Sequence, residues 1–260
     1  MKLNTTEFGQ ENSTRLYMIH GWGLCSKVFY GVAPKLAENF HVILIDLPGY
    51  GLNVNIPANR SNGILSSLEE TIIPNSAIFG WSLGGILALK YCMLHNDNNC
   101  LITCGSSPKF TSDPATHWPG ISNDLLLQFT NLLTQENSQK IIDKFLSMQA
   151  MGSETMKNDI KILKAYLRES PNPSYYELLA GLKTLMDEDL RGSTSRITCP
   201  SLHIYGKGDR LSPPSTNFIW PQKFNTRVYV FDKSSHAPFI SSPDEFVSII
   251  KDFLTQYYVK

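Results

Sequence analysis

The residue of this chain most able to do chemistry is a serine set among glycines. Ser82 lies in Gly80-Trp81-Ser82-Leu83-Gly84-Gly85, which fits the pattern G-x-S-x-G. An apolar run at residues 77–79 precedes it and a helical stretch at residues 83–95 follows it. A strand, a sharp turn and a helix in this order expose a nucleophilic serine hydroxyl. We therefore predict that Ser82 is a nucleophile; the alternative is a glycine-rich turn whose serine has no chemical role.

A serine hydroxyl needs a base to take its proton, and histidine is the usual one. Of the six histidines, His236 is the best placed, in Ser234-Ser235-His236-Ala237-Pro238. This segment follows the last predicted strand and should emerge at the carboxyl edge of a parallel sheet, beside the serine turn. His41 and His203 lie in predicted strands, where structural histidines are common, and His95 and His117 have no supporting pattern.

The histidine in turn needs a carboxylate that fixes its tautomer, following a strand at the same edge. Asp209 satisfies this in Tyr205-Gly206-Lys207-Gly208-Asp209, directly after the apolar run 202–205. Asp232 is the chief rival, since it comes four residues before His236. We prefer Asp209, because its Gly-x-Gly-Asp loop gives the carboxylate room to reach the histidine.

Negative charge develops on the substrate oxygen and needs two N–H donors, each worth about 100-fold to 1,000-fold in rate. One should be the backbone N–H of Leu83, directly after the nucleophile and at a helix N-terminus. The other should follow the first strand, in His20-Gly21-Trp22-Gly23, where glycines free the backbone of Trp22 to turn its N–H inward. A simple turn would explain these glycines but not their position. We predict Trp22 and Leu83 as the oxyanion hole.

Alternating strands and helices must position these residues. The predicted strands are residues 16–19, 42–45, 77–79, 101–103, 202–205 and 228–231, and the predicted helices are residues 28–38, 83–95 and 244–257. The strand runs are nearly continuously apolar, as in strands buried on both faces of a parallel sheet. We expect an α/β fold with a mostly parallel sheet flanked by helices.

Between two of these strands the alternation stops, and helical periodicity takes over. Three sets of residues predict apolar stripes: Leu125, Phe129 and Leu132; Ile141, Phe145 and Met148; and Met156, Ile160, Leu163 and Leu167. Ser174 and Glu177 have the spacing of a capping box that starts a further helix. We predict an all-helical cap at residues 113–190, inserted into a core of residues 1–112 and 191–260; alternatively, these helices belong to one core.

Composition excludes several classes of protein. Lys plus Arg equals Asp plus Glu at 23 each among 260 residues, so no overall charge attracts nucleic acid or an anionic membrane. The five cysteines include no C-x-x-C pair, which favours a reducing compartment and no structural metal. The first 15 residues are polar, and no apolar run approaches the roughly 18 residues that span a bilayer. We expect a cytoplasmic protein without a nucleic-acid or membrane partner.

These motifs together resemble those of the α/β-hydrolase superfamily. The resemblance rests on His20-Gly21-Trp22-Gly23, Asp46-Leu47-Pro48-Gly49-Tyr50-Gly51, the turn at Ser82, Asp209 and His236. Further motifs resemble the BioH family, the carboxylesterases of biotin synthesis. They are Ser106-Ser107-Pro108, Trp118-Pro119-Gly120-Ile121, Phe145-Leu146-Ser147-Met148-Gln149, Met151-Gly152 and His236-Ala237-Pro238-Phe239-Ile240-Ser241, so the resemblance runs nearly end to end and includes the cap.

The resemblance implies a substrate path between core and cap. Its residues would be Trp22, Ser82, Leu83, Phe145, Leu146, Ser147, Met148, Gln149 and His236. It also implies a basic face on the cap for an acidic acyl carrier protein. Lys140 with Lys144, and Lys157 with Lys161, are pairs at i, i+4 that would form this face. Lysine stands where the family is known for arginine, which keeps the charge but loses bidentate geometry.

The activity that this resemblance implies is hydrolysis of the methyl ester of pimeloyl-acyl carrier protein, by a serine esterase that needs no metal or cofactor. We expect the chain to act as a monomer. Two alternatives remain: a broad short-chain carboxylesterase or thioesterase acting on free small esters, and a hydrolase-like receptor that binds a ligand in the same pocket. Turnover of a simple ester would separate the catalysts from the receptor.

Overall fold

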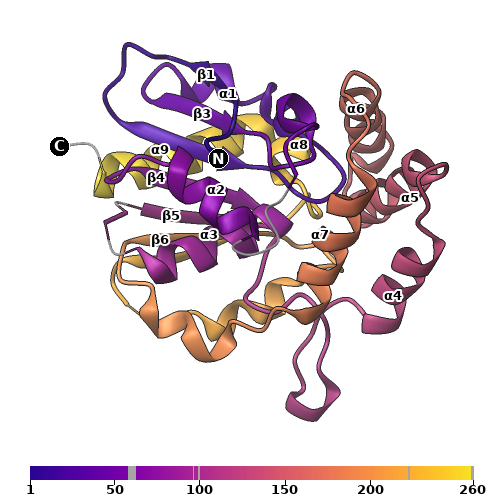
Figure 1. Cartoon of the computed structure of the whole chain (residues 1–260). Helices are drawn as coiled ribbons and strands as arrows, with labels where there is room; N and C mark the ends of the chain where they lie inside the picture. Colours follow the sequence, from indigo (N-terminus) through magenta and orange to yellow (C-terminus); the bar gives the residue numbers. More distant parts are fainter. Residues whose placement is uncertain (58–62, 96, 99, 222, 259–260) are drawn as a thin grey trace.

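The computed structural model describes residues 1–57, 63–95, 97–98, 100–221 and 223–258, and its centre is a sheet with helices on both faces (Figure 1). Its strands are β1 (Thr5–Phe8), β2 (Arg15–Ile19), β3 (His41–Ile45), β4 (Ala77–Trp81), β5 (Cys100–Cys104), β6 (Ser201–Gly206) and β7 (Thr226–Phe231). In the described part of the chain they form one seven-stranded sheet in the order β1-β3-β2-β4-β5-β6-β7. All neighbours are parallel except β1 and β3. The expected mostly parallel sheet is confirmed.

The central strands are apolar because both of their faces are covered. Every residue of β4 and β5 is buried. On β4, Phe79 packs edge-on against Phe246 of the C-terminal helix, with ring centroids 5.7 Å apart. The helix that follows β4 packs against β4 and β5 as well. Because both faces of β4 and β5 are covered, these strands have no polar face and are continuous apolar runs in the sequence. All six parallel strands contain the runs predicted for them, although β7, at the edge of the sheet, is only partly buried.

The antiparallel strand β1 was not predicted. Its sequence is Thr5-Thr6-Glu7-Phe8, and no residue of it is fully buried. It lies at the edge of the sheet and pairs only with β3, with Thr5 opposite Ile45. A short edge strand needs no continuous apolar run, so the pattern that revealed the other strands is missing here.

Five α-helices flank the sheet among the described residues. They are α1 (Ala33–Leu36), α2 (Gly63–Thr71), α3 (Leu83–Leu94), α8 (Pro238–Ser241) and α9 (Pro243–Tyr257). The predictions for residues 83–95 and 244–257 are confirmed. The prediction of one helix at residues 28–38 is wrong: a 3₁₀ turn at Ser26–Phe29 ends before Gly31, and α1 is a separate short helix with Pro34 in its first turn. Glycine and proline interrupt the helix there, because one loosens the backbone and the other lacks an N–H.

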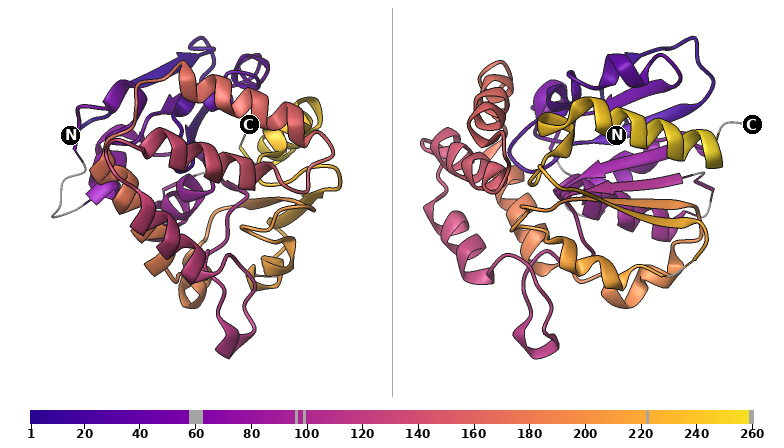
Figure 2. Two further views of the ribbon diagram at one scale, coloured as in Figure 1. Left: turned by 90° about the vertical axis from the view of Figure 1, so that its right-hand side faces the viewer. Right: turned by 180° about the vertical axis from the view of Figure 1, so that it is seen from behind.

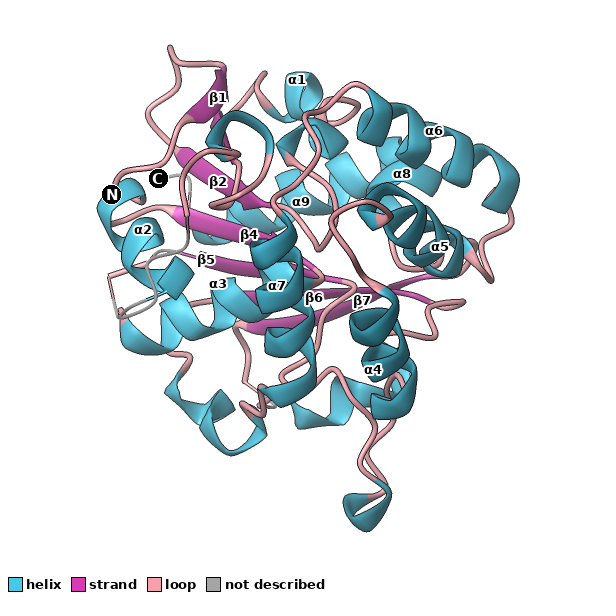
Figure 3. Ribbon diagram, turned by 45° about the vertical axis from the view of Figure 1, so that its right-hand side comes forward, coloured by secondary structure: helices cyan, strands magenta, loops and turns pink. Residues whose placement is uncertain are grey.

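Four further helices lie between β5 and β6 and gather on one side of the molecule (Figures 1 and 2). They are α4 (Asn123–Leu132), α5 (Ser138–Ala150), α6 (Met156–Arg168) and α7 (Tyr175–Asp187). Of these, α7 packs on α3, and α6 packs on α8. Figure 3 shows α7 next to α3, and α5 and α6 side by side. We use the word cap for the predicted segment 113–190, which contains all four.

The cap is joined to the core through a narrow neck. Lys109 and Asp189 form an antiparallel bridge and an ion pair of 3.3 Å. Beside them the N–H of Leu190 donates to the carbonyl of Pro108 at 2.8 Å. The chain therefore enters and leaves this region at nearly the same place, and the predicted boundary at residue 113 lies just inside the neck.

Some of the predicted cap stripes shift by a residue. In α4, Leu126 and Phe129 are buried and Leu133 follows them, whereas Leu132 is 54% exposed. The set 126, 129 and 133 also has helical spacing, so the sequence could not separate the two faces. In α6, Met156 at the N-terminus is exposed while Leu163 and Leu167 are buried.

The helix α7 starts where the sequence predicted. Ser174 is its N-cap residue, and the hydroxyl of Ser174 donates to Glu177 Oε2 at 2.5 Å.

Among the described residues, no helix combines the length and the apolar character needed to cross a membrane.

Candidate active site

Ser82 occupies a strained turn between β4 and α3. Its backbone lies at φ 56° and ψ −118°, a conformation that non-glycine residues rarely adopt and that costs about 1 to 3 kcal/mol. The N–H of Ser82 donates to the carbonyl of Cys104 on β5 at 3.0 Å, and the hydroxyl of Ser106 donates to the carbonyl of Ser82 at 3.0 Å. These bonds from the neighbouring strand hold the turn in place.

Two glycines of the G-x-S-x-G motif are required by close approach of backbone. A Cβ atom on Gly80 would lie 2.2 Å from the carbonyl oxygen of Gly84, and one on Gly84 would lie 2.4 Å from the carbonyl oxygen of Ile19. The first contact keeps α3 close to β4, and the second keeps α3 close to β2. This steric role belongs to the turn itself and does not depend on the chemistry of Ser82.

The predicted base and acid are joined by a buried hydrogen bond. His236 Nδ1 lies 2.8 Å from Asp209 Oδ2, and both side chains have no exposed surface. The other carboxylate oxygen of Asp209 accepts the N–H groups of Leu211 and Ser212 at 2.8 and 3.1 Å. Asp209 is therefore fixed by its own loop, and its free oxygen holds the imidazole.

The rival acid points elsewhere. The Asp232 side chain is 79% exposed and pairs with Lys207 at 3.0 Å. Geometry therefore favours Asp209 as the partner of His236.

The loop that carries His236 is packed tightly on the core. The backbone carbonyl of His236 accepts the indole N–H of Trp81 at 2.8 Å. A Cβ atom on Gly105, which has φ +52°, would lie 2.6 Å from that carbonyl oxygen and 3.1 Å from the ring atom Nδ1. The ring of Phe110 lies edge-on to the imidazole, with centroids 6.0 Å apart. Neither Gly105 nor Phe110 was predicted. The position of Gly105 directly after a strand is a signal that could have indicated it, whereas Phe110 has no such signal.

Ser82 Oγ and His236 Nε2, the two atoms predicted to react, are both buried, and their residues follow the carboxyl ends of β4 and β7. In the part of the chain that the structure describes, neither Ser82 Oγ nor His236 Nε2 has a hydrogen-bond partner. The structure therefore brings the base and acid into contact and leaves the serine and base unbonded. Catalytic hydrogen bonds are often long in free enzymes and tighten when substrate binds.

The two predicted oxyanion donors flank the serine. Leu83 is the first residue of α3, so its N–H has no acceptor within the helix. The backbone beside Trp22 comes close to the nucleophile, since a Cβ atom on Gly21 would lie 3.0 Å from Ser82 Cβ. The Trp22 ring is fully buried, and its Nε1 donates to the carbonyl of Leu178 on α7 at 2.8 Å.

Cap and core meet over these residues through aromatic and small side chains. Phe145 of α5 packs edge-on against Trp22, with ring centroids 4.9 Å apart. A Cβ atom on Gly181 of α7 would lie 2.7 Å from the Trp22 ring and 3.1 Å from Leu83. The sequence analysis missed Gly181, although a glycine inside a helix often marks such a close approach.

Of the five predicted wall residues on α5, three are buried and two are not. Phe145, Leu146 and Gln149 are at most 1% exposed, and both amide atoms of Gln149 lack a hydrogen-bond partner among the described residues. Ser147 and Met148 are half-buried, and the Ser147 hydroxyl donates to the Asp143 carbonyl of its own helix at 2.9 Å. The geometry therefore gives Ser147 no evident part in the path.

The predicted carrier-docking lysines lie on the cap surface. Lys140 and Lys144 are exposed on α5, and Lys157 and Lys161 are exposed on α6, which packs beside α5. Within the described ranges none of the four amines forms an ion pair. They are therefore free to meet an acidic partner.

The remaining buried histidines have structural roles. His203 is stacked on Trp220 at 3.5 Å, its Nδ1 bonds the Thr103 hydroxyl at 2.8 Å, and burial lowers its pKa to about 3. His20 accepts the N–H of Leu47 at 3.0 Å, and burial likewise lowers its pKa. Both therefore stay neutral and cannot replace His236.

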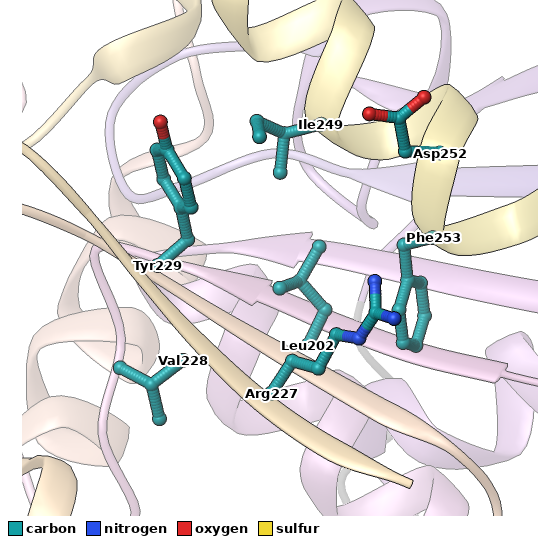
Figure 4. Close-up of a pocket in the computed structure, with 7 residues that line it drawn as sticks. All are labelled: Leu202, Arg227, Val228, Tyr229, Ile249, Asp252 and Phe253. Atoms are coloured by element: carbon teal, nitrogen blue, oxygen red, sulfur yellow. The ribbon is translucent and has the colours of Figure 1, made fainter.

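A cavity of about 290 Å³ lies between β7 and α9, away from these residues (Figure 4). Leu202, Arg227, Val228, Tyr229, Ile249, Asp252 and Phe253 line it. They come from the early parts of β6 and β7 and from α9, whereas Asp209 and His236 follow the ends of β6 and β7. None of the predicted site residues lines this cavity.

A strained serine after a central strand, next to a histidine–aspartate pair, defines a class of protein. The family model described as alpha/beta hydrolase fold matches residues 14–243, and the chain belongs to this family. Two curated relatives are pimeloyl-[acyl-carrier protein] methyl ester esterases. The one from Aeromonas hydrophila is 37% identical over 98% of this chain and 100% of its own, and the one from Vibrio cholerae is 36% identical over 93% and 94%. Within the α/β hydrolases the chain belongs to this esterase family.

Solved structures with the same fold are more distant in sequence. An esterase from Exiguobacterium antarcticum has a TM-score of 0.79 at 22% identity, covering 96% of this chain and 94% of its own. A bromoperoxidase from Bacillus anthracis has a TM-score of 0.81 at 18% identity, with the same coverage. These two structures support the fold alone.

Proposed function

We propose that this protein is a serine carboxylesterase that hydrolyses the methyl ester of pimeloyl-acyl carrier protein in biotin biosynthesis. The products are pimeloyl-acyl carrier protein and methanol. The observation that carries the proposed chemistry is the buried bond between His236 and Asp209 beside the strained Ser82. The identity of the proposed substrate is inferred from the curated relatives, whose similarity to this chain extends over the cap.

In the first half of the reaction Ser82 Oγ attacks the ester carbonyl carbon. His236 Nε2 takes the hydroxyl proton, and Asp209 stabilises the imidazolium that results. The N–H groups of Trp22 and Leu83 bind the oxyanion. Collapse of the tetrahedral intermediate breaks the bond to the methoxy oxygen, which leaves as methanol with the proton from His236. The acyl group stays on Ser82.

In the second half water replaces the alcohol. His236 takes a proton from the water as its oxygen attacks the acyl carbon, and a second tetrahedral intermediate forms. Its collapse returns the proton to Ser82 Oγ and releases the pimeloyl chain as a carboxylic acid, which then loses its proton to water. Phe145, Leu146 and Trp22 exclude bulk water from the chain, because their side chains are apolar and buried.

We further propose that the acyl carrier protein docks on Lys140, Lys144, Lys157 and Lys161. Carrier proteins are acidic, so exposed unpaired amines steer their approach. The proposed enzyme is a cytoplasmic monomer, and its mechanism uses side chains and water without a metal or cofactor.

The test is to follow methanol release from carrier-bound pimeloyl methyl ester and from free dimethyl pimelate. The proposal expects turnover of both, with the higher kcat/KM for the carrier-bound ester. Equal values would favour a broad esterase of free small esters. Binding without turnover would point to a receptor and overturn the proposal.

A further inference from the structure

The turn between α5 and α6 is bonded to the loop that carries His236. The hydroxyl of Ser235 donates to the carbonyl of Met151 at 2.7 Å. The N–H of His236 donates to the carbonyl of Gln149 at 3.2 Å, and the N–H of Glu154 donates to the carbonyl of Lys233 at 3.0 Å. Three hydrogen bonds therefore join the cap to Lys233, Ser235 and His236.

These bonds use groups that a helix end leaves unsatisfied. The last carbonyls of an α-helix have no partner within it, and α5 ends at Ala150. The N–H of His236 and the hydroxyl of Ser235 satisfy two carbonyls at this end. Ser235 is 2% exposed, so its hydroxyl has no competing contact with bulk water. The cap thus holds the base loop with buried, directional contacts.

The same turn also touches the loop of the acid. A Cβ atom on Gly152, which has φ +95°, would lie 2.5 Å from the carbonyl oxygen of Gly208, and one on Gly208 would lie 2.3 Å from the carbonyl oxygen of Gly152. Gly208 directly precedes Asp209. The backbone of the cap therefore packs against the acid loop and bonds the base loop at one place.

We propose that Ser235 is a positioning residue: it ties the base loop to the turn 151–154 of the cap, so that the cap sets the place of His236 relative to Ser82. This inference rests on the proposed roles of Ser82 and His236. The bond from Asp209 fixes Nδ1 of the imidazole, and the bonds from the cap fix the backbone from which the ring projects. Both are needed to aim Nε2 at the serine.

The neighbouring serine provides a matched control. Ser234 is fully buried, as Ser235 nearly is, and its hydroxyl contacts the hydroxyls of Ser242 at 3.1 Å and Ser241 at 2.7 Å. All three of these serines belong to the core: Ser234 lies before α8, Ser241 ends it, and Ser242 follows it. Ser234→Ala and Ser235→Ala therefore each remove one buried hydroxyl from the same loop, but only the second removes a bond to the cap.

The experiment compares these two variants in the full-length enzyme. Ser235→Ala loses one buried hydrogen bond worth about 1 kcal/mol, so we expect its melting temperature to fall by about 2 to 4 °C, and Ser234→Ala, which loses two, should fall at least as far. For Ser235→Ala we expect kcat for a nitrophenyl ester to fall about tenfold with KM within twofold, because a small displacement of a base is costly. The rate at which a fluorophosphonate labels Ser82 should fall in parallel. Ser234→Ala should keep both rates within twofold.

A second pair tests the backbone contact. Gly152→Ala forces the turn away from Gly208, whereas Gly192→Ala meets no atom within 4 Å among the described residues. We expect a loss of kcat for Gly152→Ala and none for Gly192→Ala, measured on folded protein.

The outcomes separate this inference from the proposed function. Equal kcat in Ser234→Ala and Ser235→Ala, with equal labelling, would overturn the positioning role while leaving the triad untouched. Full activity of Ser82→Ala would instead remove the proposed mechanism on which the inference rests.

Discussion

The core and the cap contribute to the site by different physical means. In the core, backbone geometry fixes each reacting group: Ser82 is strained into its turn, and Asp209 is held by two N–H groups of its own loop. In the cap, Phe145 contributes an apolar surface against Trp22, and the lysines contribute exposed charge. In the proposed mechanism the core therefore supplies the reacting side chains, and the cap supplies the acyl wall, the docking charge and the contacts that position His236.

We therefore expect the two regions to tolerate change differently. Loss of a reacting side chain removes a step of the proposed mechanism that no other residue supplies. Apolar walls and surface charges act by degree, since each methylene or amine adds a small free energy. The substitutions below are ordered by expected effect, from near-complete loss of activity for changes in the core to small effects for changes in the cap. A reversal of that order would contradict the comparison.

The largest effect should come from removing the nucleophile or the base. We expect Ser82→Ala and His236→Ala each to lower kcat for a nitrophenyl ester by about 10⁴-fold or more, since the two act as a unit. Circular dichroism should show an intact fold for both. Activity near wild type in either variant would remove the triad assignment.

Loss of the carboxylate should come next. Asp209→Asn favours the wrong imidazole tautomer, so we expect kcat to fall by up to about 10⁴-fold. Asp232→Asn is the control, because its side chain is exposed and pairs with Lys207. Steady-state kinetics of both variants decide the matter, and a larger loss in Asp232→Asn would mean that the acid is misassigned.

In the cap, the wall of the acyl path should act by degree. Phe145→Ala should raise KM for a heptanoyl ester more than for an acetyl ester, because an apolar pocket discriminates by about 1 to 3 kcal/mol per methylene. Leu163→Ala, a truncation of another fully buried cap residue, is the matched control. Equal changes for both esters in Phe145→Ala would place Phe145 in the cap core and not in the substrate wall.

Charge on the cap should matter only for the carrier-bound substrate. Reversing Lys140, Lys144, Lys157 and Lys161 to Glu should lower kcat/KM for the carrier-bound ester severalfold, most strongly at low salt, because steering weakens as the Debye length shortens to about 8 Å. Hydrolysis of a nitrophenyl ester should be unchanged. Reversing Lys2, Lys35, Lys223 and Lys251 in the core makes the same change in net charge and serves as the control. Because Lys35 and Lys251 pair with Asp244 and Glu38, its melting curve and nitrophenyl ester turnover must first show an intact enzyme. Equal losses for the carrier-bound ester in the two variants would exclude a docking role for the cap lysines.

The smallest effect concerns acid stability, which should depend on the core. The pKa of His203 is lowered to about 3 by burial, against an ordinary value near 6.5. Between these values the unfolded chain binds a proton that the folded chain does not, so the free energy of unfolding falls as the pH falls. His203→Gln should flatten this dependence in melting curves at pH 7 and pH 5. His117, the one histidine of segment 113–190, is exposed, and His117→Gln should leave the slope unchanged.

The sequence predicted best what the backbone constrains most. The six parallel strands followed from apolar runs, and the turn at Ser82 followed from glycines that steric contact requires. The edge strand β1 left no such pattern, since a half-exposed strand needs no apolar run. In α4 the sequence predicted that Leu132 is buried, but Leu126 and the following Leu133 are buried instead. Both sets of residues have helical spacing, so the pattern could not distinguish them.

The contacts between the cap and the loop that carries His236 could not be predicted from the sequence either. Two of the three bonds are made by backbone atoms of His236 and Glu154, which every residue type possesses. Only Gly152 and Gly208, small residues at a close approach, could have indicated that these loops meet. Long-range backbone contacts leave little trace in residue type.

The neck at Lys109 and Asp189 makes the cap an exchangeable module. A segment whose two ends lie side by side can be lengthened, shortened or replaced without altering the strand order of the sheet beneath it. In a chimera, a foreign cap would attach at this hinge and bring its own acyl preference. To restore full turnover the graft would also have to supply a turn that accepts the Ser235 hydroxyl and fits closely over Gly208. Exchange of the cap is therefore unconstrained at Lys109 and Asp189, but it is constrained at the turn 151–154, which lies in the middle of the inserted segment.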